Sequence, residues 1–92
     1  MNSVAKHLTI RGRVQGVGFR QFMLSAAREL GITGWVRNRA DGSVEAIIAG
    51  TPGAVAMMLE RARRGPAHAQ VTDFEITQAV ANFGRFDALP TV

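Results

Sequence analysis

Apolar and polar residues alternate with a period of two in three segments near the start of the chain, and this alternation is typical of half-buried strands. The segments are residues 7–11, 33–39 and 43–49. Residues 40–42, Ala-Asp-Gly, separate the second from the third and have the composition of a tight turn. We therefore predict a first strand, followed later in the chain by a β-hairpin.

Two other segments carry apolar residues at helical spacing. The first follows Arg20 and ends at Gly31, a residue that commonly ends a helix in the left-handed conformation. The second begins at Thr51-Pro52, an N-cap followed by proline in the first turn, and ends at Gly65-Pro66. Met57 and Met58 are interpreted as core residues of this second helix. The apolar stripes are Phe22, Met23, Ala26, Ala27 and Leu30 in the first helix, and Ala54, Val55, Met58, Leu59 and Ala62 in the second.

The last third of the chain is again strand-like. Residues 69–77 predict a fourth strand, and residues 83–88 predict a short additional one with Phe86 and Ala88 directed inward. The resulting order is βαββαβ with an extra short strand. Two βαβ units of this kind predict an α+β, ferredoxin-like sandwich in which an antiparallel sheet carries both helices on one face.

Length and composition restrict the class of protein. Ninety-two residues are expected to form a single domain over positions 1–92, because two halves would have cores too small to be stable. The chain is 47% hydrophobic, yet no apolar run approaches the roughly 20 residues that span a bilayer. The first residues lack the apolar stretch of a signal peptide, so we expect a cytoplasmic protein without a membrane partner. The absence of cysteine excludes disulfides, thiolate metal sites and a cysteine nucleophile.

The net charge of +4 is consistent with a solvated basic surface or with attraction of anionic ligands. The arginines are scattered, and only Arg61, Arg63 and Arg64 lie close together, near the predicted end of a helix. A ferredoxin-like domain that binds RNA needs aromatic residues on its first and third strands, and those strands carry none. Nucleic acid is therefore not expected as a partner. We also expect the protein to be a monomer.

A glycine-rich loop, residues 12–20 (GRVQGVGFR), joins the first predicted strand to the first helix. Gly16 and Gly18 allow positive φ angles and close approach of a ligand to the backbone. A loop of this kind can direct several N–H groups toward an anion at the positive end of a helix dipole. The alternative is that the glycines serve only to turn the chain. The loop is not a Walker A motif, because no Gly-Lys-Ser/Thr follows it. It is not a dinucleotide fingerprint either, because Gln21 stands where the third glycine would be.

Arg20 and Asn38 are the side chains with the strongest chemical interpretation. An arginine at a helix N-terminus is unfavourable unless an anion lies between it and the helix, and its planar fork can bind two phosphate oxygens. Asn38 is either a turn residue before Asp41-Gly42 or a site residue, because alternation alone does not decide which sheet face it occupies. His7 and His68 lack carboxylates at metal-ligand spacing, so no metal site is expected. Ser25 lacks a nearby histidine and is not expected to be a nucleophile.

Taken together, these segments resemble the acylphosphatase family. The resemblance covers about four-fifths of the chain and includes GRVQGVGFR at 12–20, GWVRN at 34–38, DGSVE at 41–45 and Gly65-Pro66. The sequence departs from the family pattern at Gln21, at Arg39 and over residues 86–90. A domain that begins larger, carbamoyl-phosphate-handling maturation proteins is also similar, and the shortness of this chain argues against that alternative.

The resemblance implies a fold and an activity. The fold is the βαββαβ sandwich reached above, and the activity is metal-independent hydrolysis of acyl phosphates to a carboxylate and inorganic phosphate, with no cofactor. It implies that Arg20 and Asn38 are catalytic, with Arg20 anchoring the phosphate and Asn38 orienting the attacking water. It also implies that the phosphate is held by the backbone amides of Gln15, Gly16, Val17, Gly18, Phe19 and Arg20.

Overall fold

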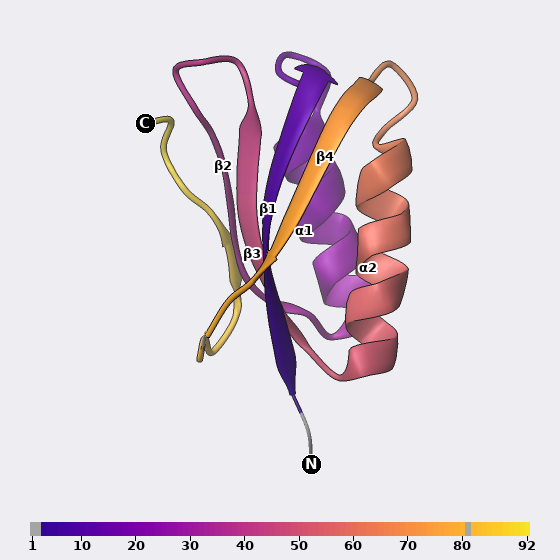
Figure 1. Ribbon diagram of the computed structural model, residues 1–92, viewed down its shortest axis with the longest axis vertical. Helices are drawn as coiled ribbons and strands as arrows, with labels where there is room; N and C mark the ends of the chain where they lie inside the picture. Colours follow the sequence, from indigo (N-terminus) through magenta and orange to yellow (C-terminus); the bar gives the residue numbers. More distant parts are fainter. Residues whose placement is uncertain (1–2, 81) are drawn as a thin grey trace.

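The computed structural model describes residues 3–80 and 82–92, and within these ranges the chain forms five strands and two helices (Figure 1). Their order is strand–helix–strand–strand–helix–strand with one more short strand, as the sequence predicts. The strands are β1 (Val4–Arg13), β2 (Thr33–Asn38), β3 (Val44–Gly50), β4 (Gln70–Gln78) and β5 (Phe86–Ala88), and the helices are α1 (Phe19–Leu30) and α2 (Pro52–Arg64).

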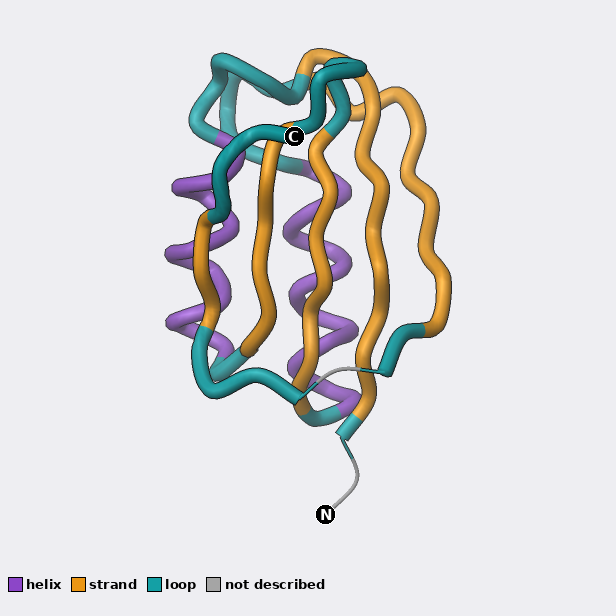
Figure 2. Tube along the Cα trace, turned by 90° about the vertical axis from the view of Figure 1, so that its left-hand side faces the viewer, coloured by secondary structure: helices purple, strands orange, loops and turns teal. Residues whose placement is uncertain are grey.

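The strands form one sheet in the order β4-β1-β3-β2-β5. Strand β1 pairs antiparallel with β3 and β4, so that Leu8 lies opposite Ala46 on one side and Ile76 on the other. Both helices cover the same face of this sheet, and the opposite face is left open (Figure 2). The ferredoxin-like arrangement predicted from the order of elements is thereby confirmed.

The predicted antiparallel pairing holds for β1 to β4 and does not extend to the short last strand, whose direction was not predicted. Strand β5 pairs parallel with β2, with Gly34 opposite Phe86 and Val36 opposite Ala88. The reason is topological. Strand β4 ends at the end of the sheet where β2 begins, so the chain that crosses to the far edge must run in the direction of β2 (Figure 1). The sheet is therefore mixed, with one short parallel pair at its edge.

The helix ends match their predicted capping residues. Gly31 follows α1 in the left-handed conformation, and its N–H donates to the carbonyl of Ala27. At the start of α2 the side chain of Thr51 accepts a hydrogen bond from the N–H of Ala54, at 3.2 Å. Gly31 therefore ends α1 and Thr51 begins α2, and both lie at the end of the sheet where β2 begins, opposite the glycine loop.

The core lies between the helices and the covered sheet face. Its strand residues include Leu8, Ile10 and Ile48, all without solvent exposure, and Met58 of α2 fills the layer above them. The interpretation of Met57 as a core residue is wrong, because its side chain is 53% exposed. Adjacent residues of an α-helix point about 100° apart, so only one of two neighbouring methionines can face the sheet.

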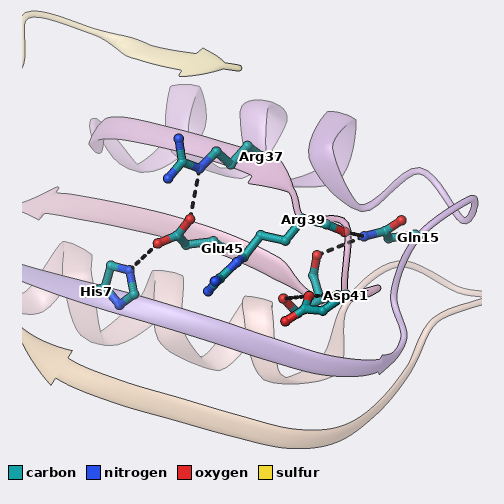
Figure 3. A network of polar contacts seen from close by, with 7 residues as sticks. His7, Gln15, Arg37, Arg39, Asp41 and Glu45 are labelled. Atoms are coloured by element: carbon teal, nitrogen blue, oxygen red, sulfur yellow. Dashed lines mark hydrogen bonds and ion pairs between the residues drawn. The ribbon is translucent and has the colours of Figure 1, made fainter. Parts of the chain in front are cut away.

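The open sheet face carries a polar network centred on Glu45 of β3 (Figure 3). Its Oε2 is 2.7 Å from Nε2 of His7, and its Oε1 accepts a hydrogen bond of 2.8 Å from Nε of Arg37. The guanidinium of Arg37 also lies 4.7 Å from the ring centroid of Trp35. The side chain of Glu45 is only 12% exposed, so these contacts link three central strands away from the helices.

Replacing Glu45 with glutamine is expected to destabilise the protein at neutral pH. Burial raises the pKa of Glu45, but hydrogen bonds from His7 and Arg37 outweigh it and leave that pKa below the ordinary value of 4.5. The carboxylate therefore stabilises the fold above pH 4.5, and this contribution is lost as the pH falls through the lowered folded-state value. We expect Glu45→Gln to cost about 1.5–3 kcal/mol at pH 7.

Urea unfolding of the wild type and of Glu45→Gln across the acidic range measures this effect. The difference in unfolding free energy should shrink below pH 4.5. Glu75→Gln is the matched control, because Glu75 is an exposed carboxylate of β4 that pairs with Arg11 of β1. If the unfolding free energy of Glu45→Gln is lower than that of the wild type by the same amount at every pH, the loss comes from packing and not from the charge of Glu45.

Candidate active site

One end of the molecule brings together the loop between β1 and α1, the β2–β3 turn and the segment after β5 (Figure 1). A cavity of about 290 Å³ opens among them. Gly16, Gly18, Phe19 and Arg20 line it on one side, and Asn38 lines it from the end of β2. Arg20 and Asn38, which are distant in sequence, therefore border the same hollow.

The loop owes its shape to two glycines in the left-handed region. Gly16 has φ 73° and Gly18 has φ 79°, and no other residue type in the described part of the chain has positive φ. A Cβ atom at either position would meet nothing within 4 Å, so the requirement for glycine is conformational and not steric. Gly18 is the N-cap of α1 and its carbonyl accepts the first helical hydrogen bond, from Phe22.

The start of α1 is electrostatically suited to an anion. The first N–H groups of a helix have no intrahelical acceptors and carry the positive end of its dipole. Within the described residues no side chain caps these groups, and no acidic residue occupies the first turn. The unmet donors therefore lie beside the cavity.

Arg20 is the second residue of α1, exposed to solvent and lining the cavity. No carboxylate among the described residues forms an ion pair with it, in contrast to Arg11, Arg37, Arg61 and Arg85. Its guanidinium is consequently available to a ligand at the helix N-terminus.

Asn38 lies on the covered face of the sheet, which the alternation of residues alone did not settle. It is two positions beyond the buried Val36, half-buried, and directed into the cavity. Its backbone carbonyl accepts a hydrogen bond of 3.1 Å from the N–H of Val92, and the N–H of Ala40 donates to the carbonyl of Val92 at 2.5 Å. The segment after β5 thus braces the strand end that carries Asn38.

Gln15 has a role that the sequence did not reveal. Its side-chain Nε2 donates to the carbonyl of Arg39 at 2.8 Å and to that of Ser43 at 2.9 Å (Figure 3). These bonds tie the glycine loop to the turn that follows Asn38. Arg39 and Ser43 are 24 and 28 residues away from Gln15 in the sequence, so no local pattern could indicate these hydrogen bonds.

The turn that Gln15 contacts is itself held rigidly. Asp41 accepts hydrogen bonds from the N–H and the hydroxyl of Ser43, at 2.9 and 2.6 Å, and these bonds lower the pKa of Asp41 below its ordinary value. The N–H of Arg39 also donates to the carbonyl of Ser43, at 2.9 Å. The loop therefore docks on a turn of defined geometry.

The side chains of the remaining candidates of the loop, Gln15, Val17 and Phe19, make contacts within the protein. Val17 is half-buried against the core, and Phe19 is 2% exposed with its ring edge-on to Phe22 at 6.0 Å. Neither the side chain of Gln15 nor that of Val17 lines the cavity. These residues can contribute backbone groups to the site, while their side chains anchor the loop.

The residues for which no catalytic or metal-binding role is expected from the sequence lie away from the cavity. His7 belongs to the Glu45 network, and His68 and Ser25 are exposed. Among residues 3–80 and 82–92, no three histidine or acidic side chains are grouped as a metal site would need. Likewise, neither helix described has the length and apolar character needed to cross a membrane.

The fold is shared with solved structures. An acylphosphatase from Coxiella burnetii has a TM-score of 0.91 at 32% sequence identity, covering 96% of this chain and 94% of that one. Full-length HypF in its phosphate- and nucleotide-bound form has a TM-score of 0.90 at 20% identity, covering 98% of this chain and 12% of that one. At that identity the similarity to HypF concerns the fold alone.

Sequence comparison gives a narrower result. The chain is 50% identical over 99 residues to an acylphosphatase of Nitrobacter winogradskyi, with 100% of both chains covered. The family model of acylphosphatases matches residues 6–87, which include the glycine loop, Arg20 and Asn38. The chain belongs to the acylphosphatase family, whose members are hydrolases that act on acid anhydrides.

Proposed function

We propose that this protein hydrolyses acyl phosphates to a carboxylate and inorganic phosphate in the cavity between the glycine loop and the end of β2. The observation that carries the proposal is the meeting of Arg20 and Asn38 in one hollow at the N-terminus of α1. Membership of the acylphosphatase family supports the reaction class.

The phosphoryl group binds to the loop between β1 and α1. The backbone N–H groups of residues 15–20 and the dipole of α1 receive its oxygens, and the guanidinium of Arg20 binds two of them at once. Charge that develops on the phosphoryl oxygens in the transition state is stabilised by these preorganised donors. The left-handed glycines and the anchored side chains of the loop hold the donors in place before the substrate arrives.

Asn38 orients the attacking water from the opposite wall of the cavity. The water oxygen forms a bond to phosphorus, the bond between phosphorus and the acyl oxygen breaks, and the electron pair leaves with the carboxylate. The proton of the water passes to a phosphoryl oxygen of the substrate itself. A carboxylate is a good leaving group, so positioning and charge stabilisation suffice without a general base. No histidine, aspartate or glutamate is among the described residues that line the cavity.

The reaction as proposed does not depend on a metal ion. Arg20 and the loop amides supply the positive charge that a divalent cation supplies in other phosphoryl-transfer sites.

Incubation of the purified protein with benzoyl phosphate in the presence of EDTA tests the proposal. We expect loss of the anhydride well above the uncatalysed rate and unchanged by the chelator. A phenyl phosphate ester, whose leaving group is poorer, should be left intact and thereby controls for contaminating phosphatases. A rate equal to the uncatalysed background contradicts the activity, and activity that EDTA abolishes and Mg²⁺ restores contradicts metal independence.

Replacing Gln15 with alanine is expected to lower kcat by about 10- to 100-fold, because the glycine loop is no longer tied to the turn beside Asn38. The fold should persist, since the carbonyls of Arg39 and Ser43 still accept from Gly42 and Arg39. Competitive inhibition by inorganic phosphate should change little, because the backbone donors of the loop remain. Steady-state kinetics with phosphate as inhibitor separates the two effects.

Gln78→Ala is the matched control for this variant. Gln78 is a glutamine at the far end of β4 whose side chain accepts a hydrogen bond from Lys6. Its replacement should leave kcat as in the wild type. An unchanged kcat in Gln15→Ala would show that the loop keeps its place without this contact.

A further inference from the structure

The cavity extends beyond the residues assigned to the phosphoryl group. Past Arg20, its lining continues with Gln21 and Leu24 of α1 and with Ala88 of β5. Leu24 lies four residues after Arg20, about 6 Å farther along the helix axis. The cavity therefore has a phosphoryl compartment at the glycine loop and, continuous with it, a far compartment between α1 and the edge strand.

Two of the three residues that line this compartment, Leu24 and Ala88, are apolar. Leu24 is half-buried and also borders a neighbouring hollow of about 320 Å³ along the seam between α1 and β5. That hollow is lined by the apolar Ala27, Ile32 and Phe86 and by the polar Arg28, Thr33 and Arg85. Ala88, expected from the sequence to face inward, is exposed, because its side of the sheet opens into the cavity. Next to the phosphoryl compartment, Leu24 and Ala88 thus present an apolar surface that is only partly covered by protein.

The in-line geometry of phosphoryl transfer indicates which part of the cavity receives the acyl group. In phosphoryl transfer the attacking and leaving oxygens lie roughly in line on opposite sides of phosphorus. With the water held at Asn38, on the sheet wall, the acyl oxygen points toward the wall formed by α1. The residues of that wall that line the cavity beyond Arg20 are Gln21 and Leu24. Ala88 lines the same part of the cavity from the sheet edge, on the strand next to β2.

We propose that Leu24 and Ala88 form the subsite for the acyl group, and that the enzyme selects acyl phosphates with an apolar or aromatic portion beyond the carbonyl carbon. This inference rests on the proposed function and adds the substrate class. A benzoyl ring is long enough to cover the apolar surface one helical turn past Arg20, whereas the methyl group of acetyl phosphate stays near the carbonyl. Removal of that apolar area from water favours the larger group.

Two variants alter the subsite in opposite ways. Ala88→Leu narrows it and Leu24→Ala removes its apolar wall, and neither changes a donor to the phosphoryl group. We expect each to raise KM for benzoyl phosphate about tenfold relative to the wild type, equivalent to about 1.4 kcal/mol. KM for acetyl phosphate and the inhibition constant of inorganic phosphate should stay near the wild-type values.

Ala56→Leu is the matched control for Ala88→Leu. It makes the same change at an exposed position of α2, and Ala56 lines neither hollow along the α1–β5 seam. Its KM values for both substrates should equal those of the wild type. Thermal unfolding of all three variants shows whether a change in KM accompanies a loss of fold.

A binding measurement separates failure of this inference from failure of the proposed function. The probes are the phosphonomethyl ketone analogues of benzoyl and acetyl phosphate, in which a methylene replaces the bridging oxygen, titrated in a calorimeter. Tighter binding of the phenyl analogue to the wild type, lost in Ala88→Leu, supports the subsite whether or not turnover occurs. Equal binding of the two analogues to the wild type, or an equal loss of both in the variants, overturns it.

Discussion

Replacing Arg20 with alanine is expected to lower kcat/KM for acyl phosphates by about 100- to 1,000-fold, the cost of losing one preorganised donor to transition-state charge. Inorganic phosphate should also inhibit much more weakly, because the proposed role of Arg20 is to bind the phosphoryl group in the ground state as well as in the transition state. The fold should be unaffected, since Arg20 is exposed and makes no ion pair with a described carboxylate. Steady-state kinetics with phosphate inhibition measures both quantities.

Two further arginine variants sharpen the result. Arg20→Lys keeps the charge but loses the planar fork, so it should recover only part of the activity. Arg28→Ala removes an exposed arginine from the last turn of the same helix and should leave phosphate inhibition as in the wild type. An Arg20→Ala variant with wild-type phosphate affinity would contradict the assignment of Arg20 as the phosphate anchor.

Most of the fold could be predicted because its signals are local. Period-two alternation places Leu8 and Ile10 on the covered face, and Gly31 and Thr51 mark helix boundaries through caps that involve only neighbouring residues. Strand β5 is different, since three residues give too short a pattern to define a partner. Its parallel pairing with β2 follows from the positions of the preceding strands, which no local pattern contains.

The candidate site likewise contains residues that local sequence signals could identify and residues that they could not. Arg20 could be singled out locally, because a cation at a helix N-terminus conflicts with the dipole unless an anion is present. The position of Asn38 required the sheet, since its side chain could be assigned to a face only once Val36 was known to be buried. Gln15 could not be found from sequence, because its partners are carbonyl groups of a distant turn. The catalytic roles themselves came from the family resemblance and stay predictions.

The hydrogen bonds around Asn38 explain why a half-exposed asparagine can keep a defined position. The segment after β5 pairs with the backbone of Asn38 and Ala40 on one side, and Gln15 contacts the carbonyl of Arg39 on the other. The same side chain of Gln15 belongs to the loop proposed to bind phosphate. Water and phosphoryl group would therefore be held by parts of the chain that are joined to each other.

Replacing Asn38 with alanine should consequently separate binding from turnover. We expect kcat to fall by about 100- to 1,000-fold, by analogy with the loss of one oriented donor in other hydrolases. The inhibition constant of inorganic phosphate should remain close to the wild-type value, because Arg20 and the loop are untouched. Pre-steady-state or steady-state kinetics with benzoyl phosphate, together with phosphate titration, measures the two effects independently.

The matched control is Asn82→Ala, which removes an exposed asparagine before β5 and should change neither constant. Phosphate affinity that falls in Asn38→Ala as far as kcat would identify Asn38 as a second phosphate ligand and not as a residue that orients water. The double variant Arg20→Ala/Asn38→Ala distinguishes these cases further. When two residues stabilise the same transition state as a unit, the double variant loses less activity than the product of the two single fold-losses. When the two residues act independently, the fold-losses multiply. Because Gln15 links the two halves of the cavity, we expect the smaller combined loss.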